Sequence, residues 1–182
     1  YAALRAIPGL VVLRPCDAHE TAEAWRVILE DLEGPSAMGL SRQDLPVLDR
    51  SESGEFASAS GLAKGAYVLS DADGAQATII ATGSEVALAL AARDLLDVPV
   101  RIVSMPSWEL FEQQDEDYQE SVLPVDMPTV SVEAGVRQGW ERYADASVSI
   151  DRFGASAPGG EVLEKLGMTA DNVAEHVREL LD

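Results

Sequence analysis

The sequence predicts an α/β fold in which strands and helices alternate around a doubly wound, mostly parallel sheet. Three observations lead to this prediction. Short continuous apolar runs, typical of strands buried on both faces, recur along the chain. Longer stretches with apolar residues three and four positions apart, typical of helices, separate these runs. Hydrophobic residues make up 47% of the 182 residues and charged residues 25%, which is a globular composition with enough apolar material for a core.

The chain opens with a β-α-β unit, and such units imply parallel pairing of their two strands. A helical tail at 1–6 precedes a strand at 10–13, and a strand at 36–40 closes the unit. Between the strands, Asp17 followed by Glu20 resembles a capping box at the start of a helix. The apolar face that this helix is expected to bury comprises Ala18, Thr21, Ala22, Trp25, Ile28, Leu29 and Leu32.

Small polar residues between 49 and 64 interrupt the pattern and predict a linker. We therefore expect three parts, residues 1–48, 49–64 and 65–182. In the third part, we expect strands at 66–69, 77–81, 100–104, 129–132 and 146–150, with the first two as a candidate hairpin. The helices are expected at 83–96, 108–114, 117–122, 139–143 and 160–166, and in a terminal segment capped by Thr169.

The formal net charge of −19 excludes the basic footprint of a nucleic-acid-binding protein and argues against docking on an anionic membrane. No apolar run has the length of a membrane span, and no signal segment opens the chain. The single cysteine, Cys16, excludes an internal disulfide framework and a multi-cysteine zinc site. These features are typical of a soluble cytoplasmic protein. Because the chain starts with Tyr1, inside what reads as the end of a helix, we expect it to be a piece of a longer protein.

Few side chains are candidates for acid–base or nucleophilic catalysis. His19 and His176 lie on predicted helices without a metal-binding spacing, and both are expected to be structural or solvated. A helix N-terminus next to Cys16 would lower the pKa of its thiol, but Asp17 opposes this effect. We therefore expect a buried, inert thiol.

Two segments that follow predicted strands are candidates for ligand contacts. Thr82-Gly83-Ser84-Glu85 offers backbone N–H groups to an anion, but it is not a phosphate-binding loop and its glutamate would repel a phosphate. We expect Ser84 to be a plain N-cap. Glu133 ends a strand at the carboxyl edge, where α/β sheets place their sites, close to Arg137. We expect it to form an ion pair or a contact with the start of a helix.

Arg42, in Leu40-Ser41-Arg42-Gln43, is the strongest candidate for binding a ligand. It follows a strand, and its guanidinium can hold a phosphate or a carboxylate with two hydrogen bonds. The alternative is a salt bridge to one of the many acidic residues. The acidic stretch is expected to be a solvated face without calcium, and comprises Glu109, Glu112, Asp115, Glu116, Asp117 and Glu120. No catalytic residue can be assigned from these patterns.

The ordered set of motifs resembles the C-terminal part of the transketolase family. The set covers almost the whole chain apart from the linker, although Cys16 stands where many relatives carry alanine. Its members include Leu13-Arg14-Pro15-Cys16-Asp17, Gly34-Pro35-Ser36-Ala37, Leu40-Ser41-Arg42-Gln43, Ala81-Thr82-Gly83-Ser84-Glu85, Val132-Glu133-Ala134-Gly135 and Phe153-Gly154-Ala155-Ser156-Ala157-Pro158.

The resemblance implies a homodimeric parent enzyme that moves a two-carbon ketol unit between sugar phosphates in the pentose phosphate pathway, with thiamine diphosphate and Mg²⁺ or Ca²⁺. It implies that residues 1–48 end a pyrimidine-binding domain and that residues 65–182 form a C-terminal domain. That domain would have three α/β/α layers and a mixed sheet with one antiparallel strand. Arg42 matches the arginine that binds the phosphate of the sugar substrate. The catalytic, cofactor and metal residues lie upstream in this family, so the chain alone is expected to be inactive, to bind no cofactor or metal, and to serve structure and dimer formation.

Two other interpretations remain. One is a related thiamine enzyme: a dihydroxyacetone synthase, a deoxyxylulose-phosphate synthase or a dehydrogenase E1 subunit. Arg14-Pro15 and Ser41-Arg42-Gln43 are not features that we associate with the last two. The other is a non-enzymatic module for dimerisation or ligand sensing, which the broken β-α-β unit at the start of the chain disfavours.

Overall fold

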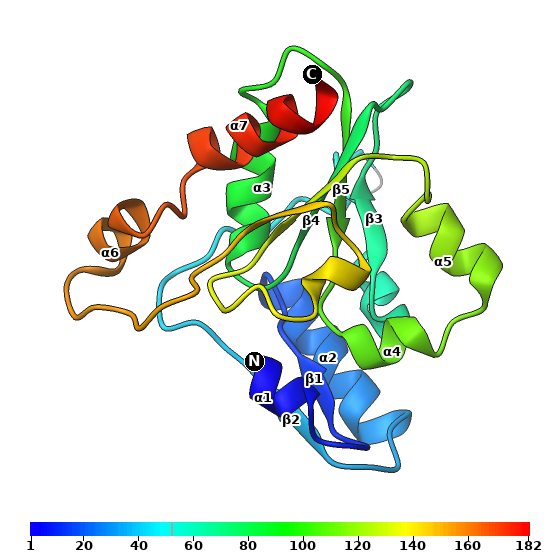
Figure 1. Ribbon diagram of the computed structural model, residues 1–182. Helices are drawn as coiled ribbons and strands as arrows, with labels where there is room; N and C mark the ends of the chain where they lie inside the picture. Colours follow the sequence, from blue (N-terminus) through cyan, green and yellow to red (C-terminus); the bar gives the residue numbers. More distant parts are fainter. Residues whose placement is uncertain (52) are drawn as a thin grey trace.

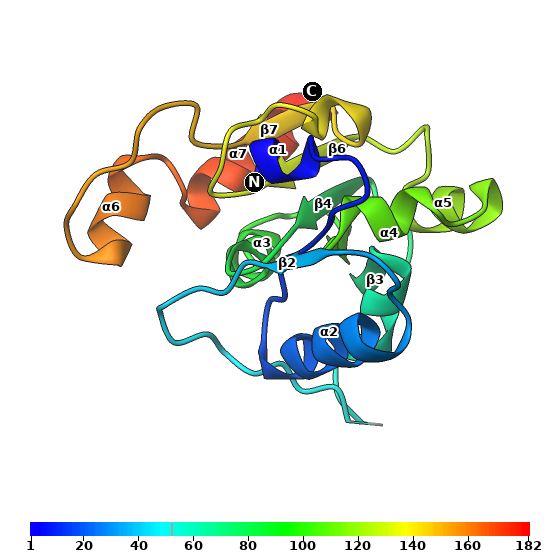
Figure 2. The ribbon, with the colours of Figure 1, turned by 90° about the horizontal axis from the view of Figure 1, so that it is seen from below.

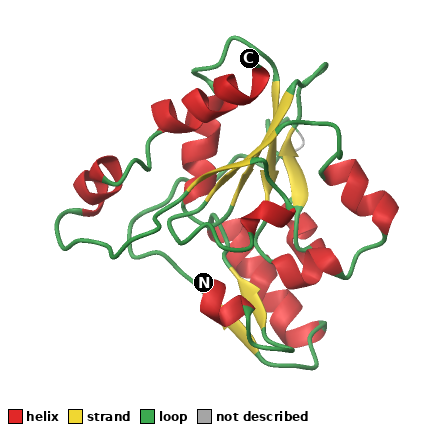
Figure 3. Ribbon diagram, in the orientation of Figure 1, coloured by secondary structure: helices red, strands yellow, loops and turns green. Residues whose placement is uncertain are grey.

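A five-stranded mixed sheet forms the centre of the larger part of the computed structural model, which describes residues 1–51 and 53–182. Glu52, in the expected linker, lies outside the described residues. The strand order is β3-β5-β4-β6-β7, and only the pairing of β3 with β5 is antiparallel (Figures 1 and 3). The strands are β3 (Tyr67–Ser70), β4 (Ala77–Ala81), β5 (Val100–Ser104), β6 (Thr129–Val132) and β7 (Ala146–Val148).

Helices cover both faces of this sheet. On one face lie α3 (Glu85–Arg93) and α7 (Ala170–Leu181); on the other lie α4 (Trp108–Glu112), α5 (Glu116–Val122) and the short η2 (Trp140–Arg142) (Figure 1). Successive residues of a strand point to opposite faces, so Ile79 packs in the first core and Ile80 in the second. The predicted three-layer α/β/α architecture is confirmed. The helix α6 (Gly159–Lys165) projects from the body, at the left of Figures 1 and 2.

The expected hairpin of β3 and β4 is wrong, because β5 lies between them. Tyr67 of β3 is in register with Ser104 of β5. β4 is buried at all five positions and has parallel neighbours on both sides, so it has no free edge for β3. A continuous apolar run such as β4 is typical of a central strand, whereas the alternating burial of β3 is typical of an edge strand.

The N-terminal β-α-β unit lies against the lower end of this sheet in Figure 1. Its strands β1 (Val11–Leu13) and β2 (Ser36–Met38) pair in parallel, as predicted. Leu13, Val27 and Leu62 are buried together in a third core. The unit also contains α1 (Ala2–Arg5) and α2 (Ala18–Glu30), and η1 (Ala59–Lys64), which contributes Leu62, packs against α2.

The buried face of α2 differs from the predicted stripe. Trp25 is 52% exposed and Leu29 is 76% exposed, whereas Glu20, Ala24 and Val27 are buried. The prediction is therefore wrong for the Trp25 side, although Ile28 and Leu32 do pack against the core. It failed because a charged residue, Glu20, belongs to the buried face.

Helix caps are confirmed at two of the three expected positions. Asp17 Oδ1 accepts a hydrogen bond from the Glu20 amide at 2.8 Å, and Thr169 Oγ1 accepts one from the Asn172 amide at 3.2 Å. Ser84 precedes α3 but forms no capping bond, because its backbone is already helical (φ −58°, ψ −23°) and its hydroxyl donates to Glu85 Oε1 at 2.6 Å. In the described part of the chain, no helix is long and apolar enough to cross a membrane.

Candidate functional site

Arg42 lies on an exposed loop that leaves the end of β2. Within the described residues it has no hydrogen bond or ion pair, so the salt-bridge alternative is not formed there. The adjacent residues Ser41 and Gln43 line a cavity of about 300 Å³ together with Tyr1 and Arg14. Arg42, the strongest candidate from the sequence, is therefore exposed and does not itself line this cavity, although both of its neighbours in the chain do.

A buried carboxylate, Glu133, is the centre of the first polar network. It is 1% exposed, and its oxygens accept hydrogen bonds from Arg5 (2.8 Å to each oxygen), Arg14 (2.9 Å) and the Trp140 indole N–H (2.9 Å). Arg14 also pairs with Glu85 at 2.9 Å. Glu133 therefore forms an ion pair, as expected, but with Arg5 and Arg14, whereas the neighbouring Arg137 pairs with Asp151. Two guanidinium groups thus balance the two carboxylates.

Burial raises the pKa of Glu133, but Arg5, Arg14 and the Trp140 N–H lower it, and the net result is a pKa below the ordinary value. Burial lowers the pKa of Arg14, and the negative charges of Glu85 and Glu133 reverse this effect and raise it. Both groups therefore stay charged at neutral pH. A general acid or base needs a pKa near the working pH, so this network is structural rather than catalytic.

The Arg14 side chain lies at the place where α/β sheets usually hold their ligands, and it lines the cavity of about 300 Å³ there together with Gly83 and Glu85. Ala81 and Val132 end β4 and β6 in register, and the connections that leave this edge run to opposite faces of the sheet. Arg14 lies at this point, with its carbonyl accepting from the Gly83 amide at 3.0 Å and its guanidinium under the Tyr1 ring, 4.2 Å from the centroid. Gly83 permits this approach, since an added Cβ would lie 3.0 Å from Arg14 Nη2.

Glu20 is the centre of a second buried network. Its Oε1 accepts from the Tyr67 hydroxyl at 2.5 Å and the Ser104 hydroxyl at 2.7 Å, and its Oε2 accepts from the Cys16 amide at 2.8 Å. Arg50 donates to the Tyr67 oxygen at 2.8 Å. The network therefore joins α2 and the expected linker to β3 and β5. The sequence indicated only a capping role for Glu20.

The remaining candidates show no catalytic geometry. Cys16 is buried, and burial, followed by the charges of Glu20 and Asp17, raises the pKa of its thiol, as expected for an inert cysteine. His19 is exposed, with Nδ1 3.8 Å from Asp17 Oδ2, and His176 contacts the Asn172 carbonyl of its own helix at 2.9 Å. Within residues 1–51 and 53–182, no group of three or more His, Cys, Asp or Glu side chains is placed to hold a metal ion.

The acidic stretch is largely a solvated face, as predicted: Glu112, Asp115, Glu116, Asp117 and Glu120 are exposed. Glu109 differs, because its carboxylate accepts from the Val12 amide at 3.1 Å and so ties α4 to β1.

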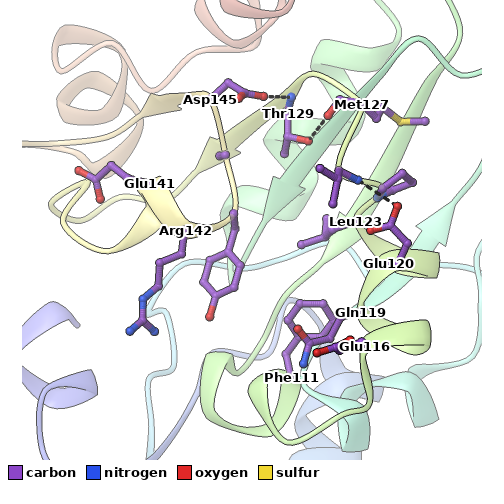
Figure 4. A pocket seen from close by; sticks show the side chains of 14 residues that line it. Phe111, Glu116, Gln119, Glu120, Leu123, Met127, Thr129, Glu141, Arg142 and Asp145 are labelled. Atoms are coloured by element: carbon purple, nitrogen blue, oxygen red, sulfur yellow. Dashed lines mark hydrogen bonds between the residues drawn. The ribbon is translucent and has the colours of Figure 1, made fainter.

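A separate pocket of about 530 Å³ lies beside α5 (Figure 4). Its lining contains four carboxylates and only one guanidinium, that of Arg142. Asp145 already accepts from the Thr129 amide at 2.9 Å, and Glu120 from the Val125 amide at 3.2 Å. An anionic ligand would be repelled there, so this pocket is not a candidate site for a phosphate.

Two family models match the chain. Residues 1–47 match the pyrimidine-binding domain of transketolase, and residues 65–169 match a transketolase-like C-terminal domain. The chain belongs to the transketolase family.

Individual relatives agree with this family assignment. The chain is 47% identical to a transketolase of Geobacillus stearothermophilus, over 99% of its own length and 28% of that protein's. A transketolase of Pichia stipitis, solved in complex with sedoheptulose 7-phosphate, is 36% identical with a TM-score of 0.92, over 99% of this chain and 26% of the other. A split-gene transketolase, described as an inactive β4 tetramer, is 28% identical with a TM-score of 0.76. The match covers 99% of this chain and 60% of the other. The chain thus spans about a quarter of the length of full transketolases.

Both buried networks join the two transketolase domain matches. Arg5 and Arg14 belong to the pyrimidine-binding match, whereas Glu85 and Glu133 belong to the C-terminal match. Glu20 and its partner Tyr67 are divided in the same way. Sequence reasoning missed Arg5, Arg14 and Tyr67 as partners in these networks. A signal did exist for Arg14, which follows a buried strand directly.

Proposed function

We propose that this chain acts as the C-terminal portion of a thiamine-diphosphate-dependent transketolase, an enzyme that transfers a two-carbon ketol unit between sugar phosphates in the pentose phosphate pathway. The observation that carries this proposal is the likeness over 99% of the chain to transketolases, one of them solved with a sugar phosphate. We assign residues 1–48 to the end of the pyrimidine-binding domain, 49–64 to the connection and 65–182 to the C-terminal domain.

Arg42 binds the phosphate group of the sugar substrate in the complete enzyme. Its exposed position, without a partner in the described part of the chain, supports this role, as does the position of its chain neighbours Ser41 and Gln43 at a cavity. Two charged hydrogen bonds to a phosphate dianion would contribute roughly 1.5–3 kcal/mol.

The described residues do not fit a site for thiamine diphosphate and its metal ion. They provide no cluster of metal ligands, and the cavity at the edge of the sheet is lined by the Glu85 carboxylate and by the Arg14 guanidinium that is already paired with it. We infer that the rest of the complete enzyme holds the cofactor, and that this chain alone is inactive. Its part is structural, including contacts in a homodimer. The likeness to a transketolase described as an inactive β4 tetramer supports this assignment.

Substrate kinetics of the complete enzyme test the role of Arg42. Arg42→Ala should raise the KM for phosphorylated ketoses by about ten- to a hundredfold, and leave unphosphorylated sugars nearly unaffected. Arg152→Ala is the matched control, because Arg152 also lies on an exposed loop without an ion pair in the described residues. Equal effects on both classes of sugar would refute phosphate binding by Arg42.

Calorimetric titration tests the inactivity of the chain by itself. The 182-residue chain should give no binding heat with thiamine diphosphate and Mg²⁺, and none with a ketose phosphate. Saturable cofactor binding would overturn this proposal and favour a ligand-sensing module.

A further inference from the structure

The loop that carries Arg42 is attached to the protein at its first residue, Gly39. The Gly39 amide donates to the Leu13 carbonyl at 2.8 Å. The Tyr1 ring lies directly against Gly39, so that an added Cβ would be 2.7 Å from a ring carbon. Only a glycine admits the ring at this distance. Residues 39–48, called here the Arg42 loop, therefore start at a fixed point.

The end of the Arg42 loop is attached as well. The Leu48 amide donates to Asp17 Oδ2 at 3.2 Å, and Arg50 Nε lies 3.3 Å from the same oxygen. The Arg50 guanidinium also donates a hydrogen bond to the hydroxyl oxygen of Tyr67 on β3. The second buried network therefore holds the loop from the other side.

Tyr1 connects the start of the loop to the carboxylates of the C-terminal unit. Its ring stacks on the Arg14 guanidinium, which pairs with Glu85 and Glu133. The contacts thus run from these two carboxylates to Arg14, to Tyr1 and to Gly39, three residues before Arg42.

We propose that the C-terminal unit orients Arg42 toward the substrate phosphate, and that Tyr1 is the positioning residue through which it does so. This inference rests on the proposed role of Arg42. The loop is held at Gly39 and at Leu48, so the range of positions that Arg42 can take is limited from both ends. Binding energy depends on how well a group is positioned, and a shift of about 1 Å can cost about two orders of magnitude. A domain without catalytic residues would then contribute directly to substrate affinity.

Substitution of Tyr1 in the complete enzyme tests the proposal. Tyr1→Leu removes the ring from both Arg14 and Gly39, and should raise the KM for a phosphorylated ketose roughly fivefold or more, with kcat little changed. Tyr1→Phe should keep the original KM, because the Tyr1 hydroxyl has no hydrogen bond to a described residue. Tyr118→Leu is the control: it also removes a ring from a cation, Lys64 at 4.1 Å, but it changes α5 and the hydrogen bond to the Ala66 carbonyl and leaves Tyr1, Arg14 and Gly39 in place.

A double-mutant cycle separates this inference from the proposed function. In an Arg42→Ala background, Tyr1→Leu should raise the KM no further, since the group that it positions is gone. If Arg42→Ala alone leaves the KM for phosphorylated sugars unchanged, the proposed role of Arg42 fails. If Arg42→Ala raises this KM but Tyr1→Leu does not, or raises it equally for unphosphorylated sugars, only the positioning role fails.

Amide hydrogen exchange in the 182-residue chain provides a readout that does not depend on activity. Exchange of the Gly39 amide reports whether the start of the loop stays bound to Leu13. Tyr1→Leu should accelerate exchange at Gly39, while Tyr1→Phe should not. Unchanged exchange in Tyr1→Leu would overturn the positioning role.

Discussion

The side chains of Arg14 and Glu133 are 2.9 Å apart although 119 positions separate them in the chain. A buried ion pair of this kind adds little stability compared with a well-packed apolar pair, because both charges must leave water. Substitution of only one of the two residues is costly, however, because the remaining buried charge is left without a partner. The pair therefore determines how the two units dock more than how strongly each one folds.

Glu133→Ala should lower the free energy of unfolding by about 3–5 kcal/mol, because Arg5 and Arg14 lose their shared partner. Urea unfolding of the chain measures this change. Glu112→Ala is the control, since Glu112 pairs with Arg142 at the exposed surface, and its loss should cost about 1 kcal/mol or less. Similar losses in both variants would contradict a special role for the buried network.

The lowered pKa of Glu133 predicts a loss of stability in acid. A carboxyl group with a lower pKa in the folded state contributes stability above its ordinary pKa, about 4.5, and this contribution disappears as the pH falls through the folded value. Unfolding free energies over a pH series should therefore decline below about 4.5, and less steeply in Glu133→Gln. Parallel profiles for the two proteins would show that Glu133 is not involved.

Tyr67→Phe should destabilise the chain by about 1–3 kcal/mol, because the buried Glu20 carboxylate and Arg50 both lose a hydrogen-bond partner. Tyr143→Phe removes a hydroxyl that meets Glu112 at the surface, and should cost less. Thermal or urea unfolding compares the two. If Tyr143→Phe is the more harmful change, the second network does not hold the units together.

Gly83→Ala should cost more stability than Gly74→Ala. Both glycines have positive φ angles, +59° and +72°, so both variants lose about 1–2 kcal/mol from backbone strain. Only Gly83 lies against Arg14, whereas Gly74 has nothing within 4 Å of an added Cβ. The difference between the urea midpoints of the two variants therefore measures the effect on the contact with Arg14. Equal midpoints would show that this contact does not contribute to stability.

Val27→Ala and Leu29→Ala test which face of α2 is buried. Val27 is buried, and truncation should cost about 1–3 kcal/mol through the cavity that it leaves. Leu29 is largely exposed, and its truncation should stay within about 0.5 kcal/mol. If Leu29→Ala lost more stability than Val27→Ala, the buried face of α2 would be the one that the sequence pattern predicts.

Local patterns were sufficient for most of the fold. The apolar run at Val100–Ser104 was recognisable as a strand, and Thr169 as a cap, because both properties depend on neighbouring residues only. The ordered motifs were enough to indicate the family, since they run along the chain in a fixed order.

Contacts between distant segments were decided only in the tertiary structure. The sequence by itself could not place β5 between β3 and β4, nor turn Glu20 inward and Trp25 outward on α2. Nor could it show that Arg14 lines the cavity at the edge of the sheet and stacks on Tyr1, whose ring lies against Gly39. A charged residue is stable inside a protein only where its partners converge, and the partners of Arg14 and Glu20 come from segments far along the chain. Periodicity records which residues are apolar, but not which carboxylate will meet which guanidinium after folding.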